Sequence, residues 1–523
     1  MTGAHPAPAE VQAHWRATGA WTDETLLDRL ARVDGAQLAI VDGEHRLTLA
    51  DLREQSGRVA AGLRQLNVLP GTVIALQLPN WWEAVVVCWA AWRCGAIVAP
   101  ITPTLRAREV GFILRQSGAR IAVVPREFRG TDYPALVRST GFAGGVIEVR
   151  GRMSLPTADA AVRAVVADPD DRAVILWTSG TTADPKGVVH THQSLRAEAD
   201  TIAAAHEIRA GEPLLLPMPV THVAGLTYGV LLPVTSGVTA VLMDTWDPGH
   251  ALELVEREHI AVMISTPVFM RTMIDHPRFA GTDTSSLRLF SLGGAGVAPA
   301  MVREGARELH CWCKRTYGST EYPTLTTGLL GDDPERDATT DGRLIDGAEL
   351  RIVDPQTGID VAPGDLGELL ARGPEMFVGY LDPELDTDAF VEGGWFRTGD
   401  LARYDGTYLT IVDRLKDVII RGGENVSAQE VEALLVTHPT VAEAACVAAP
   451  DSVMGEQVCA FVIAAGGAAP VLDELRAHLL EHGLARFKLP SRLEVRDDLP
   501  RTASGKVQKA PLRDELRAQT TST

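Results

Sequence analysis

Helix-length and strand-length segments alternate along the first half of the chain, and this alternation restricts the fold more than any other feature of the sequence. A helical pattern opens at Thr48 and ends near Pro70, after which strand-like and helix-like segments follow one another without interruption. Strands that alternate with helices in this way are typical of a parallel α/β sheet. The predicted strands cover 73–78, 96–99, 120–124, 173–177 and 238–243, and the predicted helices cover 48–66, 82–94, 108–117 and 192–206.

The character of the sequence changes near Gly347, where short β-rich runs with glycine-containing turns begin. Such runs indicate a small barrel or meander. From Arg414 onward the pattern is mixed α+β. A chain of 523 residues is expected to hold about three or four structural units. The change of pattern at Arg414 separates a large predicted domain over 1–413, which would hold several of these units, from a small one over 414–523.

The charge balance excludes one broad class of partner. With 49 Lys+Arg against 68 Asp+Glu, the formal net charge is −19, whereas a general nucleic-acid binder normally has a basic surface. An anionic small molecule is still compatible with this total, because local charge can oppose global charge. Residues 484–523 carry nine basic and five acidic side chains, a local charge of +4.

The sequence also favours a cytoplasmic protein without a membrane segment. The N-terminus has neither a basic region nor an apolar core typical of a signal peptide. The most apolar stretch, 84–101, is interrupted by Arg93, Gly95 and Pro100, so a core helix followed by a strand is expected there. Six cysteines are too few for a disulfide scaffold, and ordinary buried thiols are expected.

The most informative segment for chemistry is the loop over 176–188, with the sequence LWTSGTTADPKGV. A buried strand leads into four hydroxyl side chains, a lysine and two glycines, which together can present hydroxyls, backbone N–H groups and a cation to a polyphosphate. The spacing does not match the GxxxxGK[ST] pattern, so a simple P-loop is excluded. A hydroxyl-rich surface turn is the alternative for such a loop taken alone.

Seven separated motifs resemble those of the adenylate-forming acyl-CoA synthetases, whose relatives include luciferases and peptide-synthetase adenylation domains. The resemblance spans roughly residues 20–517 and implies a large N-terminal domain of two α/β subdomains plus a small β-barrel, with a small mobile α+β C-terminal domain. Adenylation would take place in the first domain, with ATP, Mg²⁺ and coenzyme A as cofactors. The motifs are TSGTTADPKGV (178–188), PVTHVAGL (219–226), LGGAG (292–296), TYGSTE (316–321), WFRTGDLARYD (395–405), DRLKDVIIRGGENV (413–426) and PRTASGKVQK (500–509).

The resemblance implies specific nucleotide contacts in the first domain. The 178–188 loop is the expected cradle for the β- and γ-phosphates, Tyr317 the expected neighbour of adenine, and Thr320 a phosphate contact. Glu321 is the expected Mg²⁺ ligand, since Mg²⁺ binds through one or two carboxylates plus substrate phosphates. The nucleotide-binding set is completed by Thr178, Ser179, Gly180, Thr181, Thr182, Lys186, Gly293, Gly294, Ala295, Thr316, Gly318 and Ser319.

One residue departs from the family pattern in this loop. Ala183 stands where glycine is usual, and a Cβ at a position with positive φ costs about 1–2 kcal/mol. An enzyme that is competent mainly in thioester formation is therefore an alternative.

Toward the C-terminus the resemblance assigns the ribose, the hinge and the catalytic lysine. Asp400 and Arg414 are the expected ribose and phosphate contacts, Lys416 marks the hinge between the domains, and Lys506 is the expected catalytic lysine of adenylation. A lysine there would relieve the repulsion between a carboxylate and the nucleotide phosphates, which is about 4 kcal/mol per charge pair at 4 Å in an effective dielectric of 20. Gly422 and Gly423 are expected to leave room for the pantetheine chain.

The acid itself is predicted to bind near His222, a residue that without the resemblance would more simply be structural. In the family this position gates the acyl pocket, and relatives that activate amino acids carry Asp at the next position, where this chain has Val223. Gly225, Gly229 and Gly294 are expected to leave volume for substrate. A bulky or cyclic carboxylic acid is predicted.

The predicted function is therefore an acid:CoA ligase that forms an acyl-adenylate and then a thioester. Loading of a carrier protein in place of CoA is an alternative, and a second copy of the chain is a further candidate partner. The residues assigned to catalysis are His222, Thr320, Glu321 and Lys506.

Overall fold

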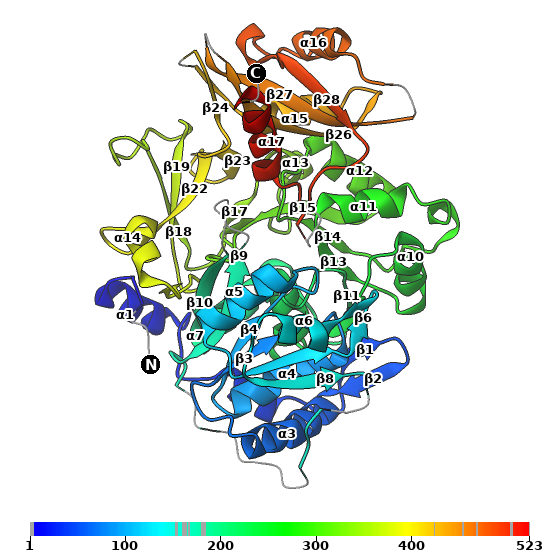
Figure 1. The fold of residues 1–523 in the computed structure, drawn as a ribbon, viewed down its shortest axis with the longest axis vertical. Coiled ribbons are helices and arrows are strands. Elements are labelled where there is room, and N and C mark those ends of the chain that lie inside the picture. Colours follow the sequence, from blue (N-terminus) through cyan, green and yellow to red (C-terminus); the bar gives the residue numbers. More distant parts are fainter. Residues whose placement is uncertain are drawn as a thin grey trace. The chain divides into compact units, whose positions relative to one another are not determined.

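The computed structural model describes residues 5–151, 155–158, 165, 168–178, 185–422, 424–451, 454–466, 469–502 and 506–521 (Figure 1). The chain packs into two compact units. The first unit comprises Met1–Glu349 and Ala371–Phe396, and the second comprises Leu350–Leu370 and Arg397–Thr523. The predicted domain boundary at 413/414 describes a hinge about which the C-terminal domain would move. It stays a prediction.

A seven-stranded sheet in the first unit confirms the predicted strand and helix alternation. Its order is β20-β10-β9-β4-β3-β5-β8, with parallel pairing among β9, β4, β3, β5 and β8. At this edge β10 pairs antiparallel with both β9 and β20; β9 and β10 follow each other in the chain without a crossover helix. The strands are β3 (Val73–Leu76), β4 (Ile97–Pro100), β5 (Ile121–Pro125), β8 (Gly145–Val149), β9 (Arg172–Thr178), β10 (Lys186–Thr191) and β20 (Gly379–Tyr380).

A nine-stranded sheet forms the other half of this unit, in the order β17-β16-β15-β14-β13-β11-β12-β1-β2. From β15 to β1 the strands are parallel, so their carboxyl ends meet at one edge, where α/β sheets commonly bind ligands. The strands are β1 (Leu38–Asp42), β2 (His45–Thr48), β11 (Pro213–Leu216), β12 (Thr239–Leu242), β13 (Val262–Ser265), β14 (Leu289–Leu292), β15 (Trp312–Tyr317), β16 (Thr326–Thr327) and β17 (Arg343–Leu344).

The helix α4 (Trp82–Arg93) explains the most apolar stretch of the sequence. Every residue from Glu83 to Trp92 is buried, because the helix packs against α3 (Leu49–Gln65), β1 and β4 within one hydrophobic core. A core helix followed by a strand was predicted here and is confirmed. No helix in the described part of the chain is long and apolar enough to cross a bilayer.

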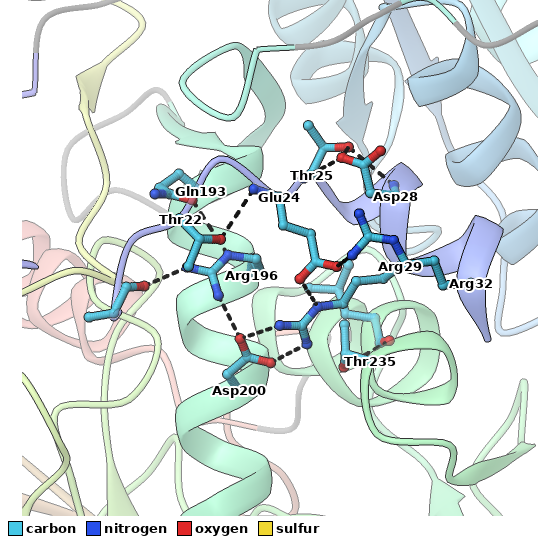
Figure 2. A network of polar contacts seen from close by, with 12 residues as sticks. Thr22, Glu24, Thr25, Asp28, Arg29, Arg32, Gln193, Arg196, Asp200 and Thr235 are labelled. Carbon is cyan, nitrogen blue, oxygen red and sulfur yellow. Dashed lines mark hydrogen bonds and ion pairs between the residues drawn. The ribbon is translucent and has the colours of Figure 1, made fainter. Parts of the chain in front are cut away.

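A charged network fixes the N-terminal segment on α7 (His192–Ala205), the helix that follows the β9–β10 hairpin (Figure 2). Asp200 accepts hydrogen bonds from Arg29 at 2.8 Å and from Arg196 at 2.7 Å, and Arg29 also bonds Glu24 at 3.0 Å. Arg196 is nearly fully buried and its guanidinium also donates to the Ala20 carbonyl at 2.5 Å. The network therefore joins the segment around α2 (Leu26–Arg32) to the helix behind the hairpin.

The predicted β-rich region forms a five-stranded sheet, and the C-terminal region is mixed α+β as predicted. In the C-terminal sheet, β26 and β27 pair antiparallel and β28 joins β27 in parallel, with α17 packed against β26. The β-rich strands are β18 (Glu349–Val353), β19 (Gly367–Arg372), β21 (Phe390–Val391), β22 (Trp395–Tyr404) and β23 (Leu409–Arg414). The C-terminal elements are β24 (Ile419–Arg421), β25 (Glu424–Val426), α15 (Ala428–Leu435), β26 (Val441–Asp451), β27 (Gly455–Ala464), α16 (Leu472–Glu481), β28 (Arg492–Arg496) and α17 (Lys509–Thr521).

Candidate active site

The predicted phosphate loop connects β9 to β10, two strands that pair antiparallel. Thr178 and Lys186 lie directly opposite each other as the last pair of the two strands, so both half-buried side chains stand at the base of the loop. The intervening residues Ser179, Gly180, Thr181, Thr182 and Ala183 lie outside the described residues. Their predicted phosphate contacts remain predictions.

The ends of β14 and β15 bring two further predicted segments together. Gly293 and Gly294 follow β14 directly, and Thr316 lies near the end of the adjacent β15. The Ser291 and Thr316 hydroxyls are 2.6 Å apart. A Cβ on Gly293 would come within 2.8 Å of the Thr316 carbonyl oxygen, and Gly294 has a φ of +73°, so glycine is required at both positions. Ala295 continues the same turn.

The turn after β15 holds Gly318, Ser319 and Thr320 in a defined geometry. A Cβ on Gly318 would lie 1.9 Å from the Pro323 carbonyl oxygen, so the close crossing of the backbone requires glycine. The Ser319 N–H donates to the Tyr322 carbonyl at 2.8 Å and the Ser319 hydroxyl accepts from the Tyr322 N–H at 3.1 Å. The turn is thus closed by its own hydrogen bonds.

His190 on β10 ties this turn to the hairpin. Its Nε2 lies 2.8 Å from the Thr320 carbonyl oxygen, and its Nδ1 lies 3.1 Å from the Ser194 hydroxyl. Burial lowers the pKa of His190 to about 4, so the ring is neutral at pH 7 and its Nε2 can carry the proton that the carbonyl accepts.

Glu321 and Lys186 are connected by a third side chain, Tyr380 of β20. The Tyr380 hydroxyl donates to Glu321 Oε1 at 2.9 Å, and the Lys186 Nζ lies 5.1 Å from the centre of the Tyr380 ring. Burial and the Glu321 carboxylate raise the pKa of Tyr380 well above its ordinary value, so the hydroxyl stays a donor. The structure thus brings two of the predicted site residues, Lys186 and Glu321, to the same aromatic side chain.

His222 begins α8 (Val223–Leu226), where its Nδ1 accepts from the Ala224 N–H at 3.3 Å. Val223 is buried. A Cβ on Gly225 would lie 1.9 Å from the Pro219 carbonyl oxygen and one on Gly229 would lie 2.4 Å from Leu216. These two glycines therefore serve close packing of the chain, and their predicted place in an acyl pocket stays a prediction.

In the second unit, Asp400 and Arg414 are opposite each other on β22 and β23. The Arg414 Nε lies 3.0 Å from Asp400 Oδ1, and the Asp400 side chain is almost fully buried while Arg414 is 41% exposed. The two residues predicted to contact the ribose are thus adjacent, with the guanidinium open to solvent.

Lys506 precedes Val507, which forms an isolated antiparallel bridge with Arg501. The Lys506 N–H donates to the Thr502 hydroxyl at 3.1 Å, and the Thr502 N–H donates to the Lys506 carbonyl at 2.7 Å. Burial, with repulsion from Arg414 and Lys416, lowers the pKa of Lys506 to about 8, against the attraction of Asp400. The pKa of Lys416 is also lowered to about 8, first by burial and then by Arg414.

Gly422 follows β24 with a φ of +60° and donates its N–H to the Met454 carbonyl at 2.8 Å. A Cβ there would meet only the flexible end of the Met454 side chain, so it is the positive φ that favours glycine. Gly423 lies outside the described residues, and the predicted pantetheine contacts of both glycines stay predictions.

Two residues of this site, His190 and Tyr380, were not among the predicted site residues. Both are distant in sequence from Thr320 and Glu321. Tyr380 lies on β20, which pairs with β10, and His190 lies on β10 itself. The sequence offers no spacing signal for a strand of two residues that joins the edge of a sheet formed much earlier in the chain.

Family models match two parts of the chain. Residues 27–381 match the model described as AMP-binding enzyme, and residues 430–506 match the model of the AMP-binding enzyme C-terminal domain. The chain belongs to the AMP-binding enzyme family, and the resemblance to adenylate-forming enzymes predicted from its motifs is confirmed.

Individual relatives align over nearly the whole chain. It is 34% identical to the 3-[(3aS,4S,7aS)-7a-methyl-1,5-dioxo-octahydro-1H-inden-4-yl]propanoyl:CoA ligase of Rhodococcus jostii (strain RHA1), over 94% of this chain and 98% of the relative. It is 33% identical to the salicyl-AMP ligase / salicyl-S-ArCP synthetase of Mycobacterium tuberculosis (strain ATCC 25618 / H37Rv), over 99% of this chain and 95% of the relative. The crystal structure of ATP-bound MatB from Rhodopseudomonas palustris superposes with a TM-score of 0.87 at 28% identity, over 94% of this chain and 99% of MatB.

Proposed function

We propose that the protein is an AMP-forming acid:CoA ligase. It would attach the AMP part of ATP to a bulky or cyclic carboxylic acid and then transfer the acyl group to CoA. In the first step a carboxylate oxygen attacks the α-phosphorus, the bond to pyrophosphate breaks, and an acyl-adenylate forms. In the second step the CoA thiol, having lost its proton, attacks the acyl carbon and AMP leaves. Family membership and the relatives that are CoA ligases support this assignment.

The observation that carries the proposal is the excess of positive charge around Lys506. Lys506, Lys416 and Arg414 interact electrostatically, and Asp400 is paired with Arg414. Burial is the main cause that lowers the pKa of both lysines to about 8, and repulsion from Arg414 adds to it, against the attraction of Asp400 and Asp417. A phosphate or carboxylate anion would balance the excess positive charge. We therefore assign Lys506 to the neutralisation of charge as the acid approaches ATP.

The first unit offers a suitable place for Mg²⁺. Glu321 is half-buried, provides hard oxygen atoms, and contacts the same Tyr380 side chain as the lysine of the phosphate loop. Among the described residues no group of three His, Cys, Asp or Glu side chains could hold a metal, so a single carboxylate together with nucleotide phosphates is the fitting arrangement. When bound, Mg²⁺ supplies neutralisation of phosphate charge. Glu321 would hold it and Thr320 would contact phosphate.

The class of acid is inferred from the pocket side and from relatives. Val223 stands where amino-acid-activating members carry Asp, so no carboxylate is available there for an α-amino group. The relative from Rhodococcus jostii acts on a fused-ring propanoyl acid, which agrees with the prediction of a cyclic substrate. His222 would line the carboxylate end of this pocket.

For the acceptor we favour CoA over a carrier protein. The exposed Arg486 and the partly exposed Lys488, which is paired with Glu430, place cations near Gly422 in the second unit. Such cations suit the phosphates of CoA. The hinge near Lys416, with domains over 1–413 and 414–523, belongs to the same proposal, as does a cytoplasmic location, in which the free thiols of the six cysteines would be stable.

A panel of aliphatic, alicyclic and aryl carboxylic acids, assayed for AMP and for acyl-CoA, tests this function. We expect cyclic acids to give stoichiometric AMP and acyl-CoA with CoA as the only acceptor. AMP release that requires a carrier protein would replace CoA by the carrier alternative, which the salicyl-AMP ligase relative represents. Thioester formation from synthetic acyl-AMP without pyrophosphate exchange would instead favour the alternative suggested by Ala183, an enzyme that is competent mainly in thioester formation.

A further inference from the structure

The position of Tyr380 follows from a short strand far from the phosphate loop in sequence. On β20, Tyr380 pairs with Val188 of β10, so Lys186 is displaced by two residues along the neighbouring strand and faces the same side of the sheet. This register explains why the Lys186 ammonium lies 5.1 Å from the Tyr380 ring centre, a distance at which a cation and an aromatic face attract each other.

The backbone around Tyr380 is held from two directions. Its N–H donates to Asp386 Oδ1 at 2.8 Å, and the N–H of nearby Phe377 donates to the Glu321 carbonyl at 2.8 Å. Gly379 has a φ of +133°, and a Cβ there would come within 2.7 Å of the Asp386 carboxylate. Because the same short segment contacts the backbone and the side chain of Glu321, the position of the Tyr380 hydroxyl relative to Glu321 is fixed on both sides.

We propose that Tyr380 is a positioning residue for the metal–nucleotide complex, and this inference rests on the proposed function. Its hydroxyl donates to Glu321 Oε1 and orients the carboxylate, while its ring attracts the Lys186 ammonium before ATP binds. One aromatic side chain thereby sets the relative position of the metal ligand and the phosphate-binding lysine. Neither role requires Tyr380 to touch the substrate.

Two substitutions separate the two roles. Tyr380→Phe removes the hydroxyl and keeps the ring, so the affinity for Mg²⁺ in the presence of ATP is expected to fall about 10-fold, the size associated with one hydrogen bond to a charged group. ATP affinity measured without divalent metal is expected to stay unchanged in this variant. Tyr380→Leu removes the ring as well, and metal-free ATP binding is expected to weaken at least threefold in addition.

The measurement is equilibrium binding without any acid or CoA, so that no turnover takes place. Calorimetry gives ATP affinity with and without Mg²⁺, and electron paramagnetic resonance of Mn²⁺ gives direct occupancy of the metal site. Tyr133→Phe is the matched control, because Tyr133 is buried in the same unit and donates a 2.8 Å hydrogen bond to the Pro103 carbonyl away from this site. Urea unfolding of each variant establishes that it is folded, and if Tyr380→Leu does not fold the Phe variant decides alone.

Three results would overturn the inference. These are an unchanged metal affinity in Tyr380→Phe, an equal loss in the Tyr133→Phe control, and a loss of ATP affinity that is the same with and without Mg²⁺. Lys186→Ala and Glu321→Gln report on the proposed function separately. If these two variants bind ATP and Mg²⁺ normally, the nucleotide site itself is misassigned, whereas their loss of binding alongside a normal Tyr380→Phe would reject only the role of Tyr380.

Discussion

Lys506 and Lys416 are neighbours with similar electrostatics but different expected roles. Both have a pKa lowered to about 8, so both lose their charge within an experimentally accessible range. Only Lys506 is expected to act on the nucleotide, while Lys416 is expected to serve the hinge. A pH profile can therefore assign the functional charge to one of them.

We expect kcat/KM for ATP in the adenylation step to be constant below pH 8 and to fall tenfold per pH unit above it. The protonated amine is the active form, and kcat/KM reports the pKa of the free enzyme. In Lys506→Arg the inflection near pH 8 should disappear at a reduced overall rate, since the guanidinium stays charged. Lys416→Arg is the control and should retain the inflection. If the inflection vanishes only in Lys416→Arg, the titrating group is Lys416 and the role assigned to Lys506 is wrong.

Buried neutral histidines make stability depend on pH. His190 and His192 are buried, and burial lowers the pKa of each to about 4 from 6.5. Between these values the unfolded chain binds a proton that the folded chain does not, so the free energy of unfolding falls as pH falls from 6.5 to 4. Each such histidine accounts for about 1.4 kcal/mol per pH unit in that range.

His192→Leu is expected to remove one of these contributions. His192 packs edge-on against Trp92, so an apolar side chain suits its surroundings. In urea titrations at pH 7 and pH 4.5, the variant should lose about 2–3 kcal/mol less than the wild type on acidification. Parallel pH dependence of the two proteins would show that His192 is not the proton-excluding group.

At the scale of elements, the N-terminal helix α2 is attached to α7 through Asp200 (Figure 2). Removal of Asp200 leaves the guanidinium of Arg196, which is 3% exposed, without its carboxylate. Loss of one partner of a buried pair is strongly destabilising, whereas an exposed pair contributes little.

Asp200→Asn is therefore expected to lower the free energy of unfolding by about 2–3 kcal/mol, less than for a fully buried pair because Asp200 is 34% exposed. Asp170→Asn is the matched control, since Asp170 pairs at 3.0 Å with Arg16 and both side chains are 41% exposed. The control should lose less than about 1 kcal/mol. Equal losses measured by urea unfolding would contradict a special role for Asp200.

The sequence predicted most elements because local signals agree with the fold. The predicted helix at 48–66 corresponds to α3, whose start is fixed by Thr48 and Asp51, each bonding the other's backbone. The site was predictable where one motif carries several groups, as in 316–321. Tyr380 and His190 are not predicted, because Tyr380 joins the site through the pairing of β20 with β10 and His190 contacts Thr320 from far along the chain, and no local pattern encodes either contact. Gly225 and Gly229 show the converse, since an absent Cβ can serve backbone packing as well as substrate volume.

At the scale of the whole molecule, the C-terminal helix reaches the predicted hinge. Arg513 of α17 forms an ion pair with Asp417 at 2.5 Å and donates to the Lys416 carbonyl at 3.4 Å. Both charged side chains are largely buried, at 14% and 12% exposure, and the ion pair holds the pKa of Asp417 below its ordinary value against the effect of burial. The helix is therefore attached to the segment predicted as the hinge, where Lys416 also interacts electrostatically with Lys506.

Arg513→Met is expected to slow pyrophosphate exchange about 10-fold, because the loop loses its restraint and Lys506 loses its fixed surroundings. Thioester formation from synthetic acyl-AMP should change less than twofold. Arg517→Met on the same helix is the control, since Arg517 is 69% exposed and its ion pair with Asp514 is long, at 3.9 Å. A uniform loss of both half-reactions in Arg513→Met would indicate a general folding defect instead.

The insertion of β20 into the sheet of the phosphate loop has a consequence for recombination among related ligases. The first unit is discontinuous in sequence, because residues 371–396 return to it after the chain has entered the second unit. A chimera with a single crossover at residue 349 would combine Lys186 and Glu321 from one parent with Tyr380 from the other. A single crossover placed after Phe396 takes all three side chains from the same parent. Chimeras of that kind are expected to retain nucleotide binding.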